Sequence, residues 1–190
     1  MIAVLNMLPF WVQSLVKHHW PGLFLPARVV LKLLKPGWGD EFDNEKLMYN
    51  KLRDLQGIHI PTFFGEAEYA GQRALLISYV NGDTLDNITH LEAADLERKL
   101  KDAFASLQPY GVAQEDHNLN NYILVDDQRI VIIDLERVLE PLSADHFQEP
   151  GRPHEPASPE EVAESAESTI WMIVRSYKLQ KEAAECGDSW

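Results

Sequence analysis

The sequence has almost no cysteine: among 190 residues there is one, Cys186. A single thiol can form no disulfide within the chain, which is typical of a protein in a reducing compartment. No residue near Cys186 suggests a base that would activate the thiol, so we expect a solvated side chain rather than a nucleophile. The cysteine content therefore favours a cytoplasmic location.

Positive charge is also scarce, with 17 Lys and Arg residues against 30 Asp and Glu and a net charge of −13. An acidic surface repels nucleic-acid backbones and anionic membrane surfaces, so we expect neither as a general partner. A nucleotide can still bind through a few local lysines or backbone N–H groups, with a divalent metal to offset its charge.

No apolar run is long enough to span a bilayer. Residues 1–16 are apolar, but Asn6, Pro9 and Gln13 interrupt them, and they lack the basic start of a secretory signal. We expect no transmembrane segment and interpret this stretch as a helix that packs onto the body of the protein. The alternative is an oligomer or partner contact through the same apolar surface.

The remaining chain alternates between strand and helix patterns, which predicts a mixed α+β fold. A strong helix start lies at Ser158, where Pro and Glu follow at the positions of a capping box. A turn is expected at Gly65, and the proline-rich residues 141–159 are interpreted as a loop. The expected strands are residues 28–34, 75–80, 122–125 and 130–133, and the expected helices are residues 43–56, 90–107 and 158–184.

The most informative stretch is residues 111–136, which contains Asp116 in a loop, Asn121 five residues later, and Asp134 after a predicted hairpin. Phosphoryl transfer uses this kind of set. One carboxylate orients the attacking hydroxyl and accepts its proton, while an amide and a second carboxylate hold Mg²⁺ against the nucleotide phosphates.

These residues, together with Val29–Lys32, Glu45 and the strand ending at Val80, resemble the protein-kinase-like superfamily. The similarity is greatest to aminoglycoside-phosphotransferase-type domains and fungal protein-kinase-like domains. It implies a reduced two-lobed fold. Residues 1–82 would form a small N-terminal lobe with a sheet, a helix and a hinge strand, and residues 83–190 a mostly helical C-terminal lobe.

The resemblance also assigns roles to individual residues. It implies that Asp116 is the catalytic aspartate and that Lys32 pairs with Glu45 as part of the catalytic machinery. It implies nucleotide contacts from Lys32, Tyr79 and Val80, and Mg²⁺ ligands at Asn121 and Asp134. The cofactors implied are Mg²⁺ and ATP, and the partner is a small-molecule substrate.

Three departures from the family pattern limit the resemblance. Gln114 stands where the family has a catalytic-loop histidine, and Glu115 adds a charge beside Asp116. Only Gly22 is available before residue 32 for a phosphate-covering glycine-rich loop. After Asp134 there is no recognisable activation segment, so an ordinary protein kinase is not expected.

Three hypotheses follow. The first is a Mg-ATP-dependent phosphotransferase acting on a small molecule. The second is a repurposed kinase fold without nucleotide binding, which performs acid–base or cyclisation chemistry on an apolar metabolite of secondary metabolism. The third is a non-catalytic pseudokinase that binds a partner protein. We favour the first because all five polar positions are retained.

Overall fold

The computed structural model describes residues 25–139 and 158–187. The expectations for the apolar residues 1–16, for Gly22 and for most of the proline-rich segment fall outside this part of the chain. The described elements form an α+β fold in which every strand pair is antiparallel. Their order is β1 (Val29–Leu33), α3 (Gly39–Lys51), η2 (Arg53–Leu55), β2 (Phe63–Tyr69), β3 (Gln72–Ser78), β4 (Asp83–Thr84), η3 (Leu85–Asn87), α4 (Ala93–Ala105), η4 (Gln108–Tyr110), β5 (Ala113–Gln114), η5 (Leu119–Asn121), β6 (Tyr122–Val125), β7 (Arg129–Ile132), β8 (Val138–Leu139) and α5 (Pro159–Gly187).

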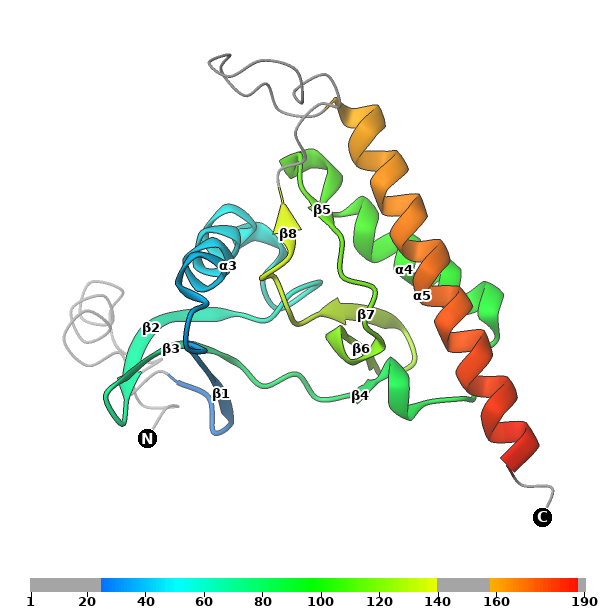
Figure 1. Cartoon of the computed structure of the whole chain (residues 1–190), viewed down its shortest axis with the longest axis horizontal. Helices are drawn as coiled ribbons and strands as arrows, with labels where there is room; N and C mark the ends of the chain where they lie inside the picture. Colours follow the sequence, from blue (N-terminus) through cyan, green and yellow to red (C-terminus); the bar gives the residue numbers. More distant parts are fainter. Residues whose placement is uncertain (1–24, 140–157, 188–190) are drawn as a thin grey trace, which may run out of the picture.

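The first sheet has the strand order β1-β3-β2, and helix α3 lies beside it (Figure 1). The helix packs through its apolar side, where Met48 and Tyr49 are buried. The Tyr49 ring stacks on Phe63 of β2, with ring centroids 5.3 Å apart. Lys32 stands opposite Leu75 in the β1–β3 ladder, on the edge strand of this sheet.

The second sheet has the order β4-β6-β7. Helices α4 and α5 lie side by side next to this sheet, on the side away from the first sheet (Figure 1). Leu96, Leu100 and Phe104 of α4 are buried at the predicted helical spacing. Helix α5 begins at the predicted capping box, since Ser158 Oγ accepts from the Glu161 N–H and the Ser158 N–H donates to the Glu161 carboxylate.

A short ladder joins β5 to β8 and connects the loops that carry Asp116 and Asp134. Gln114 is opposite Val138 in this ladder. The loops before β6 and after β7 are therefore held side by side.

One hydrophobic cluster contains residues from both sides of the predicted boundary at residue 82, including Leu75 of β3 and Leu100 of α4. A backbone hydrogen bond from Ile132 to the His59 carbonyl, 2.9 Å long, also connects β7 to the loop before β2. The division into two lobes at residue 82 stays a prediction.

Several element boundaries differ from the expectation. Helix α3 begins at Gly39 rather than at residue 43, and its N-cap Trp38 provides no side-chain cap. Strand β2 continues through Gly65, which adopts φ of +131° at an irregularity in the ladder instead of ending the strand. Strand β3 ends at Ser78, so Tyr79 and Val80 follow the strand rather than belonging to it.

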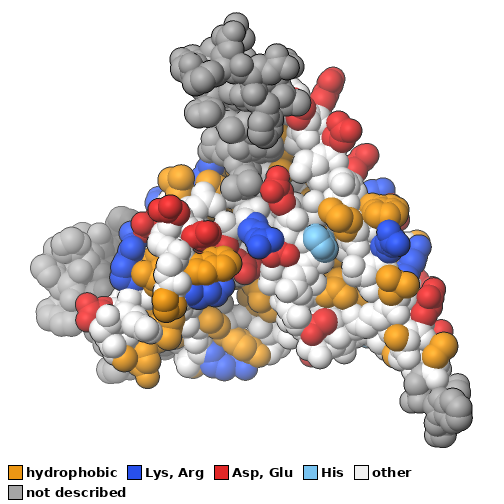
Figure 2. Space-filling view, in the orientation of Figure 1, with side chains coloured by type: hydrophobic (Ala, Val, Ile, Leu, Met, Phe, Trp, Pro, Cys, Tyr) orange, Lys and Arg blue, Asp and Glu red, His pale blue; other side chains and the backbone are white. Residues whose placement is uncertain are grey.

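None of the described helices combines the length and apolar character needed to cross a membrane. On the face drawn in Figure 2, acidic and basic side chains are interspersed, with no broad patch of either sign.

Candidate functional site

The structure brings Lys32 of β1 and Glu45 of α3 together as a close ion pair. Lys32 Nζ lies 2.7 Å from Glu45 Oε2. The strand presents the lysine toward the helix, and Glu45 projects from the helix side that packs onto the sheet. The pairing that the sequence predicted is therefore present, while the catalytic role of the pair stays a prediction.

Burial controls the ionisation of this pair. Glu45 is completely buried, and desolvation raises its pKa to about 7 although the Lys32 charge opposes the rise. Its other oxygen accepts from the Leu135 N–H at 3.4 Å. Burial alone would lower the pKa of Lys32, but the carboxylates of Glu45 and Asp134 raise it above the ordinary value.

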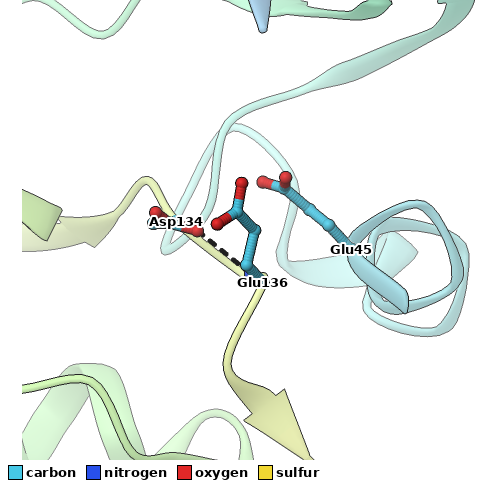
Figure 3. Close-up of side chains that lie close together, drawn as sticks. All are labelled: Glu45, Asp134 and Glu136. Carbon is cyan, nitrogen blue, oxygen red and sulfur yellow. Dashed lines mark hydrogen bonds between the residues drawn. The ribbon is translucent and has the colours of Figure 1, made fainter. Parts of the chain in front are cut away.

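Asp134 follows β7 and joins the same cluster. Its Oδ1 atom lies 2.9 Å from Lys32 Nζ, and Glu136 Oε1 lies 3.1 Å from the same nitrogen. Glu45, Asp134 and Glu136 each direct a carboxylate oxygen toward a common point, with these oxygens within 4.8 Å of one another (Figure 3). Lys32 thus meets three acidic groups from two separate segments.

Asp116 lies in the loop after β5, and its conformation is fixed by local hydrogen bonds. Its Oδ1 atom accepts from the Asn118 N–H at 2.9 Å, and its carbonyl accepts from the Tyr122 hydroxyl. Gln114, completely buried, donates from Nε2 to the Asp134 carbonyl at 2.8 Å and accepts at Oε1 from the Asp116 N–H at 3.2 Å. This glutamine therefore ties the Asp116 loop to the Asp134 loop.

An apolar cavity of about 430 Å³ lies between the two sheets. Lys32, Asn121 and Asp134 stand at its polar side, and Tyr79 and Val80 form part of its wall. The remaining wall consists of Val30, Leu31, Pro61, Ile77, Ser78, Ile123 and Ile133. Apolar walls with a few polar groups at one side are typical of sites that bind small organic molecules.

A more polar cavity of about 720 Å³ shares Asn121 and Asp134 with the apolar one. Asp116, Glu136 and Lys35 also line it. A third cavity, of about 550 Å³, lies between α4 and α5 and is lined by none of the residues predicted from the sequence. All seven predicted residues therefore belong to one region, with Glu45 buried behind Lys32.

Oxygen donors of the kind that bind a divalent cation lie where the two cavities meet. Asn121 and Asp134 offer oxygens where the two cavities meet, and oxygen ligands are those that Mg²⁺ prefers. Lys32 lines the apolar cavity, and its ammonium group lies 2.9 Å from the Asp134 carboxylate.

Sequence reasoning did not assign a role to Lys35 or Glu136. Lys35 Nζ lies 3.1 Å from Glu136 Oε2. Lys35 is three residues beyond Lys32, and Glu136 is two residues beyond Asp134. Both residues are therefore close in the sequence to predicted site residues, and this closeness is the only feature of the sequence that could have indicated them.

No protein-family model matches the sequence, and no curated protein matches it. Among solved structures, the chain is similar to a point mutant of the PknI kinase domain of Mycobacterium tuberculosis, with 22% identity and a TM-score of 0.47. The match covers 64% of this chain and 53% of that kinase domain, so the chain spans about half of the length of that relative. The functional conclusion therefore depends on the site itself.

Proposed function

We propose that the protein is a phosphotransferase of the kinase-like type that uses Mg-ATP and acts on a small molecule. The observation that carries the proposal is the position of Lys32. Its ammonium group is held by Glu45 and Asp134 at the wall of the apolar cavity, and Asp134 also lines the polar cavity. A protein that binds a nucleotide base in an apolar cavity and transfers phosphate beside it needs a fixed cation next to that cavity.

The proposal gives each side chain a task. The apolar cavity takes the base beside Tyr79 and Val80, and Lys32 contacts a phosphate. Asn121 and Asp134 hold Mg²⁺, which when bound offsets phosphate charge. Asp116 faces the polar cavity, where it orients a substrate hydroxyl and accepts its proton.

Glu45 serves Lys32 rather than the substrate. It is buried behind the lysine and has no place in the lining of either cavity. Its carboxylate fixes the direction of the lysine side chain, which otherwise has many rotamers. We therefore regard Glu45 as a positioning residue.

The first experiment is a thermal-shift titration with ATP and ADP, with and without Mg²⁺ or Mn²⁺. A ligand that binds only the folded state raises the melting temperature. The free energy of unfolding increases by about 2.7 kcal/mol when the ligand is in hundredfold excess over its dissociation constant.

Asp134→Asn should abolish the metal-dependent shift, because it removes a charged ligand of the cation. Asp116→Asn should keep the shift and lose substrate phosphorylation. Equal activity of both variants and the wild type would contradict the proposal.

One observation supports a second candidate, a repurposed site without nucleotide binding. Lys32 is already in contact with three carboxylates, at 2.7, 2.9 and 3.1 Å. An apolar metabolite could then fill the cavity of about 430 Å³ while the polar groups perform acid–base chemistry. Absence of any thermal shift at millimolar nucleotide with either metal would favour this candidate.

A further inference from the structure

Lys35 and Glu136 form a contact at the wall of the polar cavity. Lys35 Nζ lies 3.1 Å from Glu136 Oε2 and 3.3 Å from Oε1. The same ammonium group lies 4.6 Å from the centroid of the Trp38 ring. Since Glu136 Oε1 is also 3.1 Å from Lys32 Nζ, one carboxylate bridges two lysines.

The backbone of Glu136 is anchored independently of these lysines. Its N–H donates to Asp134 Oδ1 at 3.0 Å, and its carbonyl accepts from Asn44 Nδ2 of α3 at 3.2 Å. The side chain is only 11% exposed. These contacts direct the carboxylate to the space between Lys32 and Lys35.

Three carboxylates surround the Lys32 ammonium group, which donates a hydrogen bond to Asp134 Oδ1 and forms ion pairs with Glu45 and Glu136. An ammonium group has three N–H donors, and Lys32 meets three carboxylates within 3.1 Å. A phosphate oxygen that approaches Lys32 therefore competes with these carboxylates, and movement of one carboxylate away favours the contact. Glu45 is completely buried, whereas Glu136 lines the polar cavity and has space into which to turn.

We propose that Lys32 and Lys35 together form an anion site for a phosphate group, and that Glu136 occupies this site as an internal carboxylate until the ligand displaces it. That the anion is a nucleotide phosphate rests on the proposed function. Two lysines and the three carboxylates of Glu45, Asp134 and Glu136 leave one negative charge if all are ionised. This excess charge opposes any further anion, and the loss of the Glu136 charge removes it.

The test uses inorganic tripolyphosphate, without divalent metal, titrated calorimetrically into the full chain. Glu136→Gln should bind it roughly tenfold more tightly than the wild type, because the competing charge is gone while the side-chain size is kept. Lys35→Met should bind it several-fold more weakly than the wild type, and this substitution leaves the backbone anchors of Glu136 intact.

Glu66→Gln is the matched control. The Glu66 carboxylate also bridges two cations, Lys46 and Arg73, but it lies on β2 and lines neither cavity. The affinity of the Glu66→Gln variant for tripolyphosphate should equal that of the wild type. A general effect of removing one acidic charge would instead tighten binding in both glutamine variants and would overturn the inference.

Mg-ATP binding by the same proteins separates the inference from the proposed function. If the wild type binds Mg-ATP but neither Glu136→Gln nor Lys35→Met changes tripolyphosphate affinity, the inference is wrong and the proposed function stands. If both variants shift tripolyphosphate affinity as expected but no protein binds Mg-ATP, the anion site stands and the nucleotide does not. If neither probe binds to any of the proteins, both are overturned.

Discussion

At the residue scale, the buried carboxyl group of Glu45 is the most unusual feature of the site. Desolvation raises its pKa from 4.5 to about 7, against the attraction of Lys32. A folded-state pKa above the unfolded value means that the folded protein binds more protons between these two pH values. The stabilising contribution is therefore complete below about pH 4.5 and is lost as the pH rises through about 7.

This shift predicts a pH-dependent difference between the wild type and Glu45→Gln. Glutamine resembles the protonated side chain at every pH, so the free energy of unfolding of the wild type should fall relative to that of the variant between pH 5 and pH 8. The expected relative change is roughly 1–3 kcal/mol. Urea unfolding of both proteins at several pH values measures it. Parallel stability curves would show that the Glu45 carboxyl does not titrate in this window.

Residues at the site were partly predictable because their chemistry implies their partners. The family resemblance implied the pairing of Lys32 with Glu45, and the two groups do form an ion pair, although β1 is an edge strand of its sheet. Glu136 and Lys35 were not predicted, because nothing in a linear sequence shows that one carboxylate reaches two lysines from a different segment. That contact depends on how β1 and the loop after β7 are placed in space.

At the element scale, the β5–β8 ladder holds together the loops that carry Asp116 and Asp134, and Gln114 connects them. Both ends of its side-chain amide bond to the backbone of the loops that carry Asp116 and Asp134. Gln56 is a useful comparison, since it bonds in the same way to the Tyr49 carbonyl and the Phe63 N–H, away from both cavities.

We predict that Gln114→Leu and Gln56→Leu each lower the free energy of unfolding by about 1–3 kcal/mol, because each leaves backbone groups without a partner. Only Gln114→Leu should also weaken stabilisation by Mg-ATP, since only this glutamine positions site residues. Chemical denaturation and thermal-shift titration of the two variants measure the two effects. Equal loss of nucleotide stabilisation in both variants would assign Gln114 a purely structural role.

Elements with a clear local signal were predicted well. The β6–β7 hairpin follows from two apolar runs around Asp126 and Asp127, which adopt φ of 51° and 52° in the turn. Strand β2 was not predicted at all, because a turn was expected at Gly65, and glycine in a sequence indicates a turn as readily as a kinked strand. The start of α3 was placed too late, since Trp38 at its N-cap provides none of the usual capping side chains.

At the scale of the whole molecule, the site depends on segments on both sides of residue 82. Lys32 and Glu45 precede this position, while Asp134 and Glu136 follow it. The hydrophobic cluster also extends across it. Because both the core and the site extend across residue 82, unfolding of either part exposes the buried side of the other. We therefore expect the protein to unfold as one unit.

This continuity predicts one cooperative unfolding transition for the described core. Leu75 on β3 and Leu100 on α4 are both completely buried, and one lies on each side of residue 82. Leu75→Ala and Leu100→Ala should each shift the same single transition, with a loss of about 2–5 kcal/mol. Differential scanning calorimetry measures this through the ratio of calorimetric to van't Hoff enthalpy, which should be close to one for the wild type. Two independently folding lobes would instead give two transitions, and each substitution would move only the transition of its own lobe.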